Sequence, residues 1–170
     1  MVTGSRRIAA GLLCGALLLG AGMAAVAPGP AQAQASSPVR MIADRLHVRN
    51  HRGGYLPRVV AGVEAARRAG VEVRIDGGFC FSACTAWLAL ERVCVAPWTQ
   101  FGFHAPSDPR SGRKLSGAAF ENATTHVAGY YRPPLARWWM REGRHVSRGM
   151  ALLSGADLIA MGYRACPTGS

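Results

Sequence analysis

The sequence predicts an α/β fold, because segments with strand and helix patterns alternate along the chain. Residues 71–75 alternate apolar and charged side chains, as a half-buried strand does. The preceding residues 57–69 repeat apolar positions such as Val59 and Ala66 at helical spacing, and Gly70 ends that segment. We therefore expect a layered sheet with flanking helices and right-handed crossovers between parallel strands.

The same alternation continues toward the C-terminus. A short strand is expected to end at Val48, and the turn-forming residues 50–54 come after it. Further elements are expected as a buried helix over 82–90, strands over 92–95 and 100–104, and helices over 118–131, 133–141 and 154–161. Ser154 is the expected N-cap of the last helix.

The N-terminal residues have the three parts of a secretory signal peptide. Arg6 and Arg7 precede an apolar run over 8–27, and the small-residue signature Ala31-Gln32-Ala33 comes after it. We expect cleavage after Ala33, with Ala35 as the second choice, and a periplasmic or secreted protein. The alternative is a retained membrane anchor, since the apolar run approaches the length needed to span a bilayer.

Removal of residues 1–33 leaves one domain of ordinary size, which we expect as a flexible leader over 34–45 and a folded domain over 46–170. The chain carries 20 Lys and Arg residues against 9 Asp and Glu residues, a net charge of +11. The arginines are scattered, whereas a nucleic-acid-binding protein more often concentrates them on one face. We expect no nucleic-acid partner, and the charge is suited to weak contact with an anionic envelope surface. A homo-oligomer is compatible with the sequence.

Four cysteines lie beyond the predicted signal peptide: Cys80, Cys84, Cys94 and Cys166. An even number of cysteines in an oxidising compartment indicates disulfides, and four cysteines allow three pairings. Cys80 and Cys84 are close in sequence, so Cys80–Cys84 with Cys94–Cys166 is favoured. A four-cysteine zinc site is the alternative, although the spacings do not match the usual paired knuckles.

Three short segments carry residue types suited to nucleophilic catalysis. Ser82 follows a glycine pair at the start of a predicted helix, where free backbone N–H groups favour developing negative charge. A serine needs a base to take its proton, and His104 ends a strand that can lie alongside. The turn at Gly53-Gly54 can bring bare N–H groups to a substrate. A nucleophile, a base and an oxyanion hole are thereby all available.

These segments resemble the Clp protease proteolytic-subunit branch of the ClpP/crotonase superfamily, in particular its small exported bacterial members. The resemblance rests on the motifs Asn50-x-x-Gly53-Gly54, Phe81-Ser82-Ala83-Cys84, Arg92-Val93-Cys94-Val95-Ala96-Pro97 and Gly102-Phe103-His104-Ala105-Pro106. Leu153-Ser154-Gly155-Ala156-Asp157 and Met161-Gly162-Tyr163 resemble the closing helix and strand of the family. The resemblance implies a ClpP/crotonase-like fold, shortened at its N-terminus, with no cofactor and no metal.

The resemblance also implies a role for each matching residue. Ser82 would be the nucleophile and His104 the general base, and the N–H groups of Gly54 and Ala83 would form the oxyanion hole. The aspartate that the family uses as third residue would fall near Gly149 or Met150, neither of which can orient a histidine. Candidate replacements are Asp108, Glu121 and Glu142, and the alternatives are a Ser–His dyad or an inactive site.

The expected function is an exported serine peptidase-like hydrolase that acts on a peptide or another acyl substrate. The alternative is a catalytically inactive binding or assembly domain of the same fold, which the missing aspartate favours. Acyl-CoA chemistry fits less well, because CoA is a cytoplasmic cofactor. The distance between the Ser82 hydroxyl and the His104 ring distinguishes the hydrolase from the inactive domain.

Overall fold

The computed structural model describes residues 37–167, and the predicted signal peptide over residues 1–33 lies outside them. The strands are β1 (Val39–Ile42), β2 (Arg45–Val48), β3 (Glu72–Ile75), β4 (Phe79–Phe81), β5 (Val93–Val95), β6 (Gln100–Phe103), β7 (Ala151–Ser154) and β8 (Arg164–Ala165). The helices are α1 (Leu56–Ala69), α2 (Gly117–Ala128), α3 (Pro133–Arg141) and α4 (Gly155–Ala160), with 3-10 helices η1 (Ser82–Ala89) and η2 (Gly143–His145).

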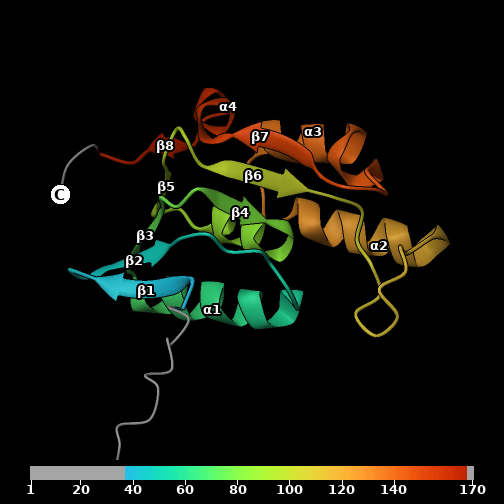
Figure 1. The fold of residues 1–170 in the computed structure, drawn as a ribbon, viewed down its shortest axis with the longest axis horizontal. Helices are drawn as coiled ribbons and strands as arrows, with labels where there is room; N and C mark the ends of the chain where they lie inside the picture. The colour runs from blue at the N-terminus through green and yellow to red at the C-terminus, as the bar shows by residue number, and fades with distance from the viewer. Residues whose placement is uncertain (1–36, 168–170) are drawn as a thin grey trace, which may run out of the picture. The chain divides into compact units, whose positions relative to one another are not determined.

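The first sheet has five strands in the order β1-β2-β3-β5-β8 (Figure 1). β1 and β2 are antiparallel, and the other neighbours are parallel. The register aligns Val48, Ile75 and Val95 at the carboxyl ends of three adjacent strands, and all three side chains are fully buried. The prediction of an α/β protein with a layered sheet and flanking helices is confirmed, and the sheet is mixed.

The second sheet has three strands in the order β4-β6-β7, with β4 parallel and β7 antiparallel to β6. After β3 the chain crosses into this sheet through Gly77-Gly78, and after β5 it crosses through Pro97 to Thr99. The buried Thr99 hydroxyl donates a hydrogen bond of 2.6 Å to the Gly77 carbonyl, which links the two crossings. The segments that follow β3 and β5 thus run side by side into the second sheet.

The structure departs from the expected elements at several positions. Part of the range expected as a flexible leader forms β1, which pairs with β2 across a turn where Ala43 and Asp44 adopt positive φ. The sequence does not predict the strands β4 and β7, and β8 begins just after residues 161–163, which resemble the closing strand of the family. These three strands have only two to four residues each, so pairing with their neighbours defines them more than their own sequence does.

The segment after β4 is a 3-10 helix rather than the expected α-helix. Its apolar residues are buried nearly throughout, so the prediction of burial is correct while the helix type is not. The helices α1 and α3 have a proline within their first two residues and end close to the expected residues. Ser154 forms a capping box with Asp157 at the start of α4, as the sequence predicts for the cap.

Aromatic rings fill the core between the second sheet and the helices α2 and α3. Phe103 contacts Tyr131, Trp138 and Trp139, mostly edge to face. On the other side, α1 packs against η1, where Trp87 reaches Gly62. Among residues 37–167, no helix combines the length and apolar character needed to cross a membrane.

The structure contains two disulfides, Cys80–Cys84 and Cys94–Cys166. They are the two pairs that the sequence favours, and they leave none of these four thiols to bind zinc. Cys94 lies in β5 and Cys166 follows β8, so this bond fastens the last strand to the first sheet. Both bonds are compatible with an oxidising, extracytoplasmic compartment.

Candidate active site

The second sheet brings the three candidate segments together. His51 forms a parallel bridge with Cys80 of β4, and Phe81 of β4 lies opposite Gly102 of β6. His51, β4 and β6 lie side by side in this sheet and run parallel. The residues that follow each of them along the chain therefore come next to one another. The Gly53-Gly54 turn, Ser82 and His104 consequently meet at one end of the sheet, as a parallel arrangement requires.

The side chains of Ser82 and His104 face each other. Nε2 of His104 lies 2.9 Å from Oγ of Ser82, within hydrogen-bond distance, and both residues are partly exposed. In the tautomer with a proton on Nδ1, the serine hydroxyl donates to Nε2. This is the geometry that a general base needs to take the proton of a hydroxyl nucleophile.

Ser82 has an unusual backbone conformation. Its φ is +55°, a region that non-glycine residues rarely occupy, and it stands where β4 passes into η1. A sharp turn between strand and helix raises the serine side chain above the sheet edge and exposes its hydroxyl. Backbone strain of this kind is concentrated at functional sites.

Gly53 is packed directly against this turn. A Cβ at Gly53 would lie 2.6 Å from the Phe81 carbonyl oxygen and 2.8 Å from Cβ of Ser82, and φ at Gly53 is +94°. Both the contact and the conformation therefore require glycine. At Gly54 φ is +114°, but a Cβ there would meet no atom within 4 Å.

Ala83 and the glycine turn lie close to each other beside Ser82. Ala83 is the second residue of η1, so its N–H has no acceptor within the helix. A Cβ at Gly53 would lie 3.0 Å from the Ala83 nitrogen, so the glycine turn approaches this N–H closely. Gly54 is the next residue, on the open side of the same turn. Gly54 and Ala83 line the same cavity as Ser82.

The other ring nitrogen of His104 has two neighbours, neither of them a carboxylate. Nδ1 lies 2.8 Å from the Ala105 carbonyl oxygen and 3.0 Å from Nζ of Lys114, which also donates to that carbonyl at 2.8 Å. A proton on Nδ1 can be donated to the Ala105 carbonyl, which leaves Nε2 free to accept. Donation from the Lys114 ammonium to Nδ1 instead selects the opposite tautomer.

The three acids considered as a third residue are engaged elsewhere. Asp108 accepts hydrogen bonds from Arg110 and Ser111 within its own turn, which lowers its pKa. Glu121 pairs with Arg144, and Glu142 accepts from the Trp138 indole. At the position where the family resemblance expects aspartate, the sulfur of Met150 lies over Gly102.

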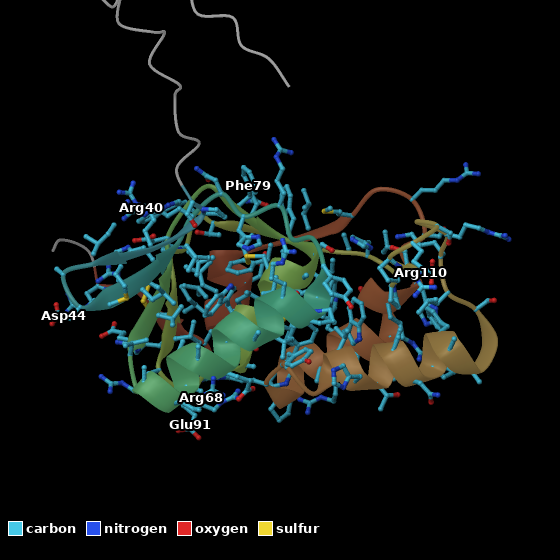
Figure 2. The ribbon with its side chains drawn as sticks, turned by 90° about the horizontal axis from the view of Figure 1, so that it is seen from below. Arg40, Asp44, Arg68, Phe79, Glu91 and Arg110 are labelled. Atoms are coloured by element: carbon cyan, nitrogen blue, oxygen red, sulfur yellow. A yellow bond between two sulfur atoms is a disulfide. The ribbon has the colours of Figure 1, made fainter. Side chains whose placement is uncertain are left out.

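An open cavity of about 820 Å³ adjoins Ser82 and His104. Its wall is largely aromatic and aliphatic and includes Arg110. Figure 2 labels Arg110, which lies in the loop before α2. The lining residues that project from helices and loops include Tyr55, Leu56, Leu115, Val127, Tyr130 and Trp139. An apolar cavity with a few convergent polar groups is typical of a small-molecule or side-chain binding site.

Several polar groups of this cavity are satisfied within the protein. The Tyr131 hydroxyl lies 2.7 Å from Oγ1 of Thr85, which in turn donates to the Ser82 carbonyl at 2.8 Å. Burial raises the pKa of Tyr131 well above its usual range, so this hydroxyl stays neutral. Tyr130 and His126 are hydrogen bonded to each other. With these pairs satisfied internally, the rest of the wall is suited to apolar groups.

The histidine His51 supports the glycine turn. Its Nδ1 accepts a hydrogen bond of 2.9 Å from the Gly53 N–H, and burial lowers its pKa. The neutral form is therefore favoured, and only that form has a free Nδ1 lone pair. The neighbouring His47 binds Asp76.

The sequence does not identify Lys114 and Thr85 as site residues. Lys114 reaches His104 through a short hairpin in which Leu115 bonds to the Pro106 carbonyl, and Ser107 pairs with Lys114. The Pro and Gly residues of this segment predict a loop but not its register. Thr85 lies three residues after Ser82, a spacing that could have indicated its bond to the Ser82 carbonyl.

Comparison with protein-family models finds no match, and comparison with curated proteins finds no significantly similar sequence. The arrangement of Ser82, His104 and the two backbone N–H groups is therefore the main basis for assigning a function.

Proposed function

We propose that this protein is an exported serine hydrolase of the ClpP/crotonase type, with Ser82 as nucleophile and His104 as general base. The observation that carries the proposal is the 2.9 Å approach of the serine hydroxyl to Nε2 of His104. The family assignment is supported by the order of the glycine turn, the serine and the histidine along the chain. It is also supported by their meeting at one cavity.

In the proposed reaction, Oγ of Ser82 attacks an acyl carbonyl while its proton passes to Nε2 of His104. The carbonyl oxygen becomes an oxyanion, to which the N–H groups of Gly54 and Ala83 donate. The protonated imidazole then gives its proton to the leaving group as that bond breaks, which leaves an ester on Ser82. Water attacks this ester with the same help from His104, and the serine is restored.

The proposed base works without a carboxylate. The Ala105 carbonyl, 2.8 Å from Nδ1, is positioned to accept the Nδ1 proton and to hold the required tautomer. A neutral acceptor stabilises the imidazolium less than an aspartate would, so a slow enzyme is expected. The large apolar cavity beside Ser82 favours a peptide or ester with a bulky apolar group next to its carbonyl.

The second candidate function is a binding or assembly domain that has lost catalysis. The Lys114 ammonium beside Nδ1 favours it, because it stands where a Ser–His–Asp triad has a carboxylate. In that case the cavity would bind its ligand without turnover.

Hydrolysis of p-nitrophenyl esters with short and long acyl chains separates the two functions. We expect Ser82→Ala and His104→Ala to lower kcat/KM by roughly 100-fold or more. Ser147→Ala is the control, since this serine is exposed and does not line the cavity, and the substitution should leave the rate within about twofold. Equal rates for the wild type and Ser82→Ala would contradict the hydrolase proposal.

A further inference from the structure

The Cys80–Cys84 disulfide brackets the proposed nucleophile. Cys80 is the middle residue of β4, Cys84 is the third residue of η1, and both side chains are fully buried. Ser82 lies midway between them, so the bond closes a small ring of chain with the serine at its apex. The ring joins the end of a strand to the beginning of a helix.

Other contacts also hold the turn at Ser82, including its hydrogen bond to His104 and the pairing of Phe81 with Gly102. The φ of +55° at Ser82 is unfavourable for a residue with a Cβ, and the start of η1 has no side-chain cap. Gly53 limits movement on one side by close packing, and Thr85 binds the Ser82 carbonyl. The disulfide fixes the chain on both sides of the serine at once, which neither of these contacts does.

The two disulfides differ in the length of chain that each one closes. Cys94–Cys166 spans a sequence separation of 72, whereas Cys80–Cys84 spans 4. Loop-closure entropy makes the long connection the larger contributor to global stability. The short one restricts little of the unfolded chain, so its main consequence is local and falls on Ser82.

We infer that the Cys80–Cys84 disulfide positions Ser82, so that the site is assembled only when these two cysteines are oxidised. This inference rests on the proposed hydrolase function. Formation of the bond removes two protons and two electrons from the thiols, which a small-molecule disulfide takes up as it is reduced to two thiols. The dithiol form would leave the turn free to relax and Ser82 free to turn away from His104.

Steady-state ester hydrolysis by paired cysteine variants tests the inference. We expect Cys80→Ala/Cys84→Ala to lower kcat by at least tenfold while KM changes by less than about threefold, because the cavity wall is retained and the position of the nucleophile is not. Cys94→Ala/Cys166→Ala is the matched control. It should keep kcat near the wild-type value and show the larger fall in thermal midpoint.

The outcomes separate this inference from the function on which it rests. A wild type no faster than Ser82→Ala overturns the hydrolase proposal and this inference with it. An active wild type with an unchanged kcat in Cys80→Ala/Cys84→Ala overturns the inference alone, as does an equal loss of kcat in both double variants. If the first double variant lacks the wild-type circular dichroism spectrum, Cys80→Val/Cys84→Ala, which restores core volume, is measured with the same criteria.

Discussion

Nζ of Lys114 lies 3.0 Å from Nδ1 of His104, on the side of the imidazole that faces away from Ser82. A carboxylate at this place would stabilise the imidazolium that forms when His104 accepts a proton, whereas an ammonium opposes it. Burial lowers the pKa of Lys114, which reduces this opposition as the pH rises. The site is therefore expected to work better at alkaline pH than at neutral pH.

Replacement of Lys114 by methionine is expected to increase kcat/KM at pH 7 by roughly fivefold, the effect of about 1 kcal/mol for one charge pair near the surface. The gain should shrink as the pH approaches the pKa of Lys114, where the wild-type side chain loses its own proton. Ester hydrolysis measured from pH 6 to pH 10 gives both profiles. Arg113→Met, which removes a neighbouring charge, is the control, and a slower Lys114→Met variant would contradict this role.

Substitution of His51 should change how stability depends on pH. Burial lowers the pKa of His51 in the folded state, so the unfolded chain takes up the proton first as the pH falls. The stability that neutral His51 contributes is complete above its unfolded pKa of about 6.5 and declines as the pH falls below that value. Urea unfolding at pH 7.5 and pH 5 should show a larger loss for the wild type than for His51→Asn.

Asparagine at this position can still accept from the Gly53 N–H but has no proton to gain. The other histidines are common to both proteins, so the difference between the two pH profiles isolates His51. Identical profiles for the wild type and His51→Asn would show that this residue does not set the pH dependence.

The two glycines of the turn should respond differently to alanine. Gly53→Ala places a methyl group 2.6 Å from the Phe81 carbonyl oxygen, so the turn or Ser82 must move. We expect a loss of stability of about 2–3 kcal/mol and a fall in kcat of more than tenfold. Gly54→Ala meets no neighbour within 4 Å, so only its positive φ is penalised, at about 1–2 kcal/mol.

Chemical denaturation and ester hydrolysis measure both variants. Because Gly54→Ala keeps its N–H, it should retain more activity than Gly53→Ala. The reverse order would contradict the close packing of Gly53 against the nucleophile turn.

Local signals in the sequence predict the elements that depend on local physics. Helix α1 ends within a residue of the expected range because Gly70, with φ of +63°, stops it, and Ser154 caps α4. The strands β1 and β4 depend on partners far along the chain or across a turn, and neither has a clear alternating pattern. The 3-10 form of η1 depends on the turn at Ser82, which composition does not reveal.

The site is predictable in part for the same reason. Ser82 and His104 stand at recognisable boundaries, a helix start and a strand end, so their residue types in that order indicate chemistry. Lys114 reaches Nδ1 of His104 only through the register of a hairpin. The sequence alone offers three acids as partners of this nitrogen, and none of them lies there. Long-range pairing, rather than residue type, decides what stands behind the histidine.

Activation of the Ser82 hydroxyl by His104 is the property on which the proposed function depends. It can be measured by reaction of the oxidised protein with a fluorophosphonate, followed by peptide mass spectrometry. We expect a single phosphonyl adduct on Ser82 that forms at least tenfold more slowly in His104→Ala and is absent from Ser82→Ala. An adduct on another residue, or labelling of Ser82 at the same rate without His104, would contradict this activation.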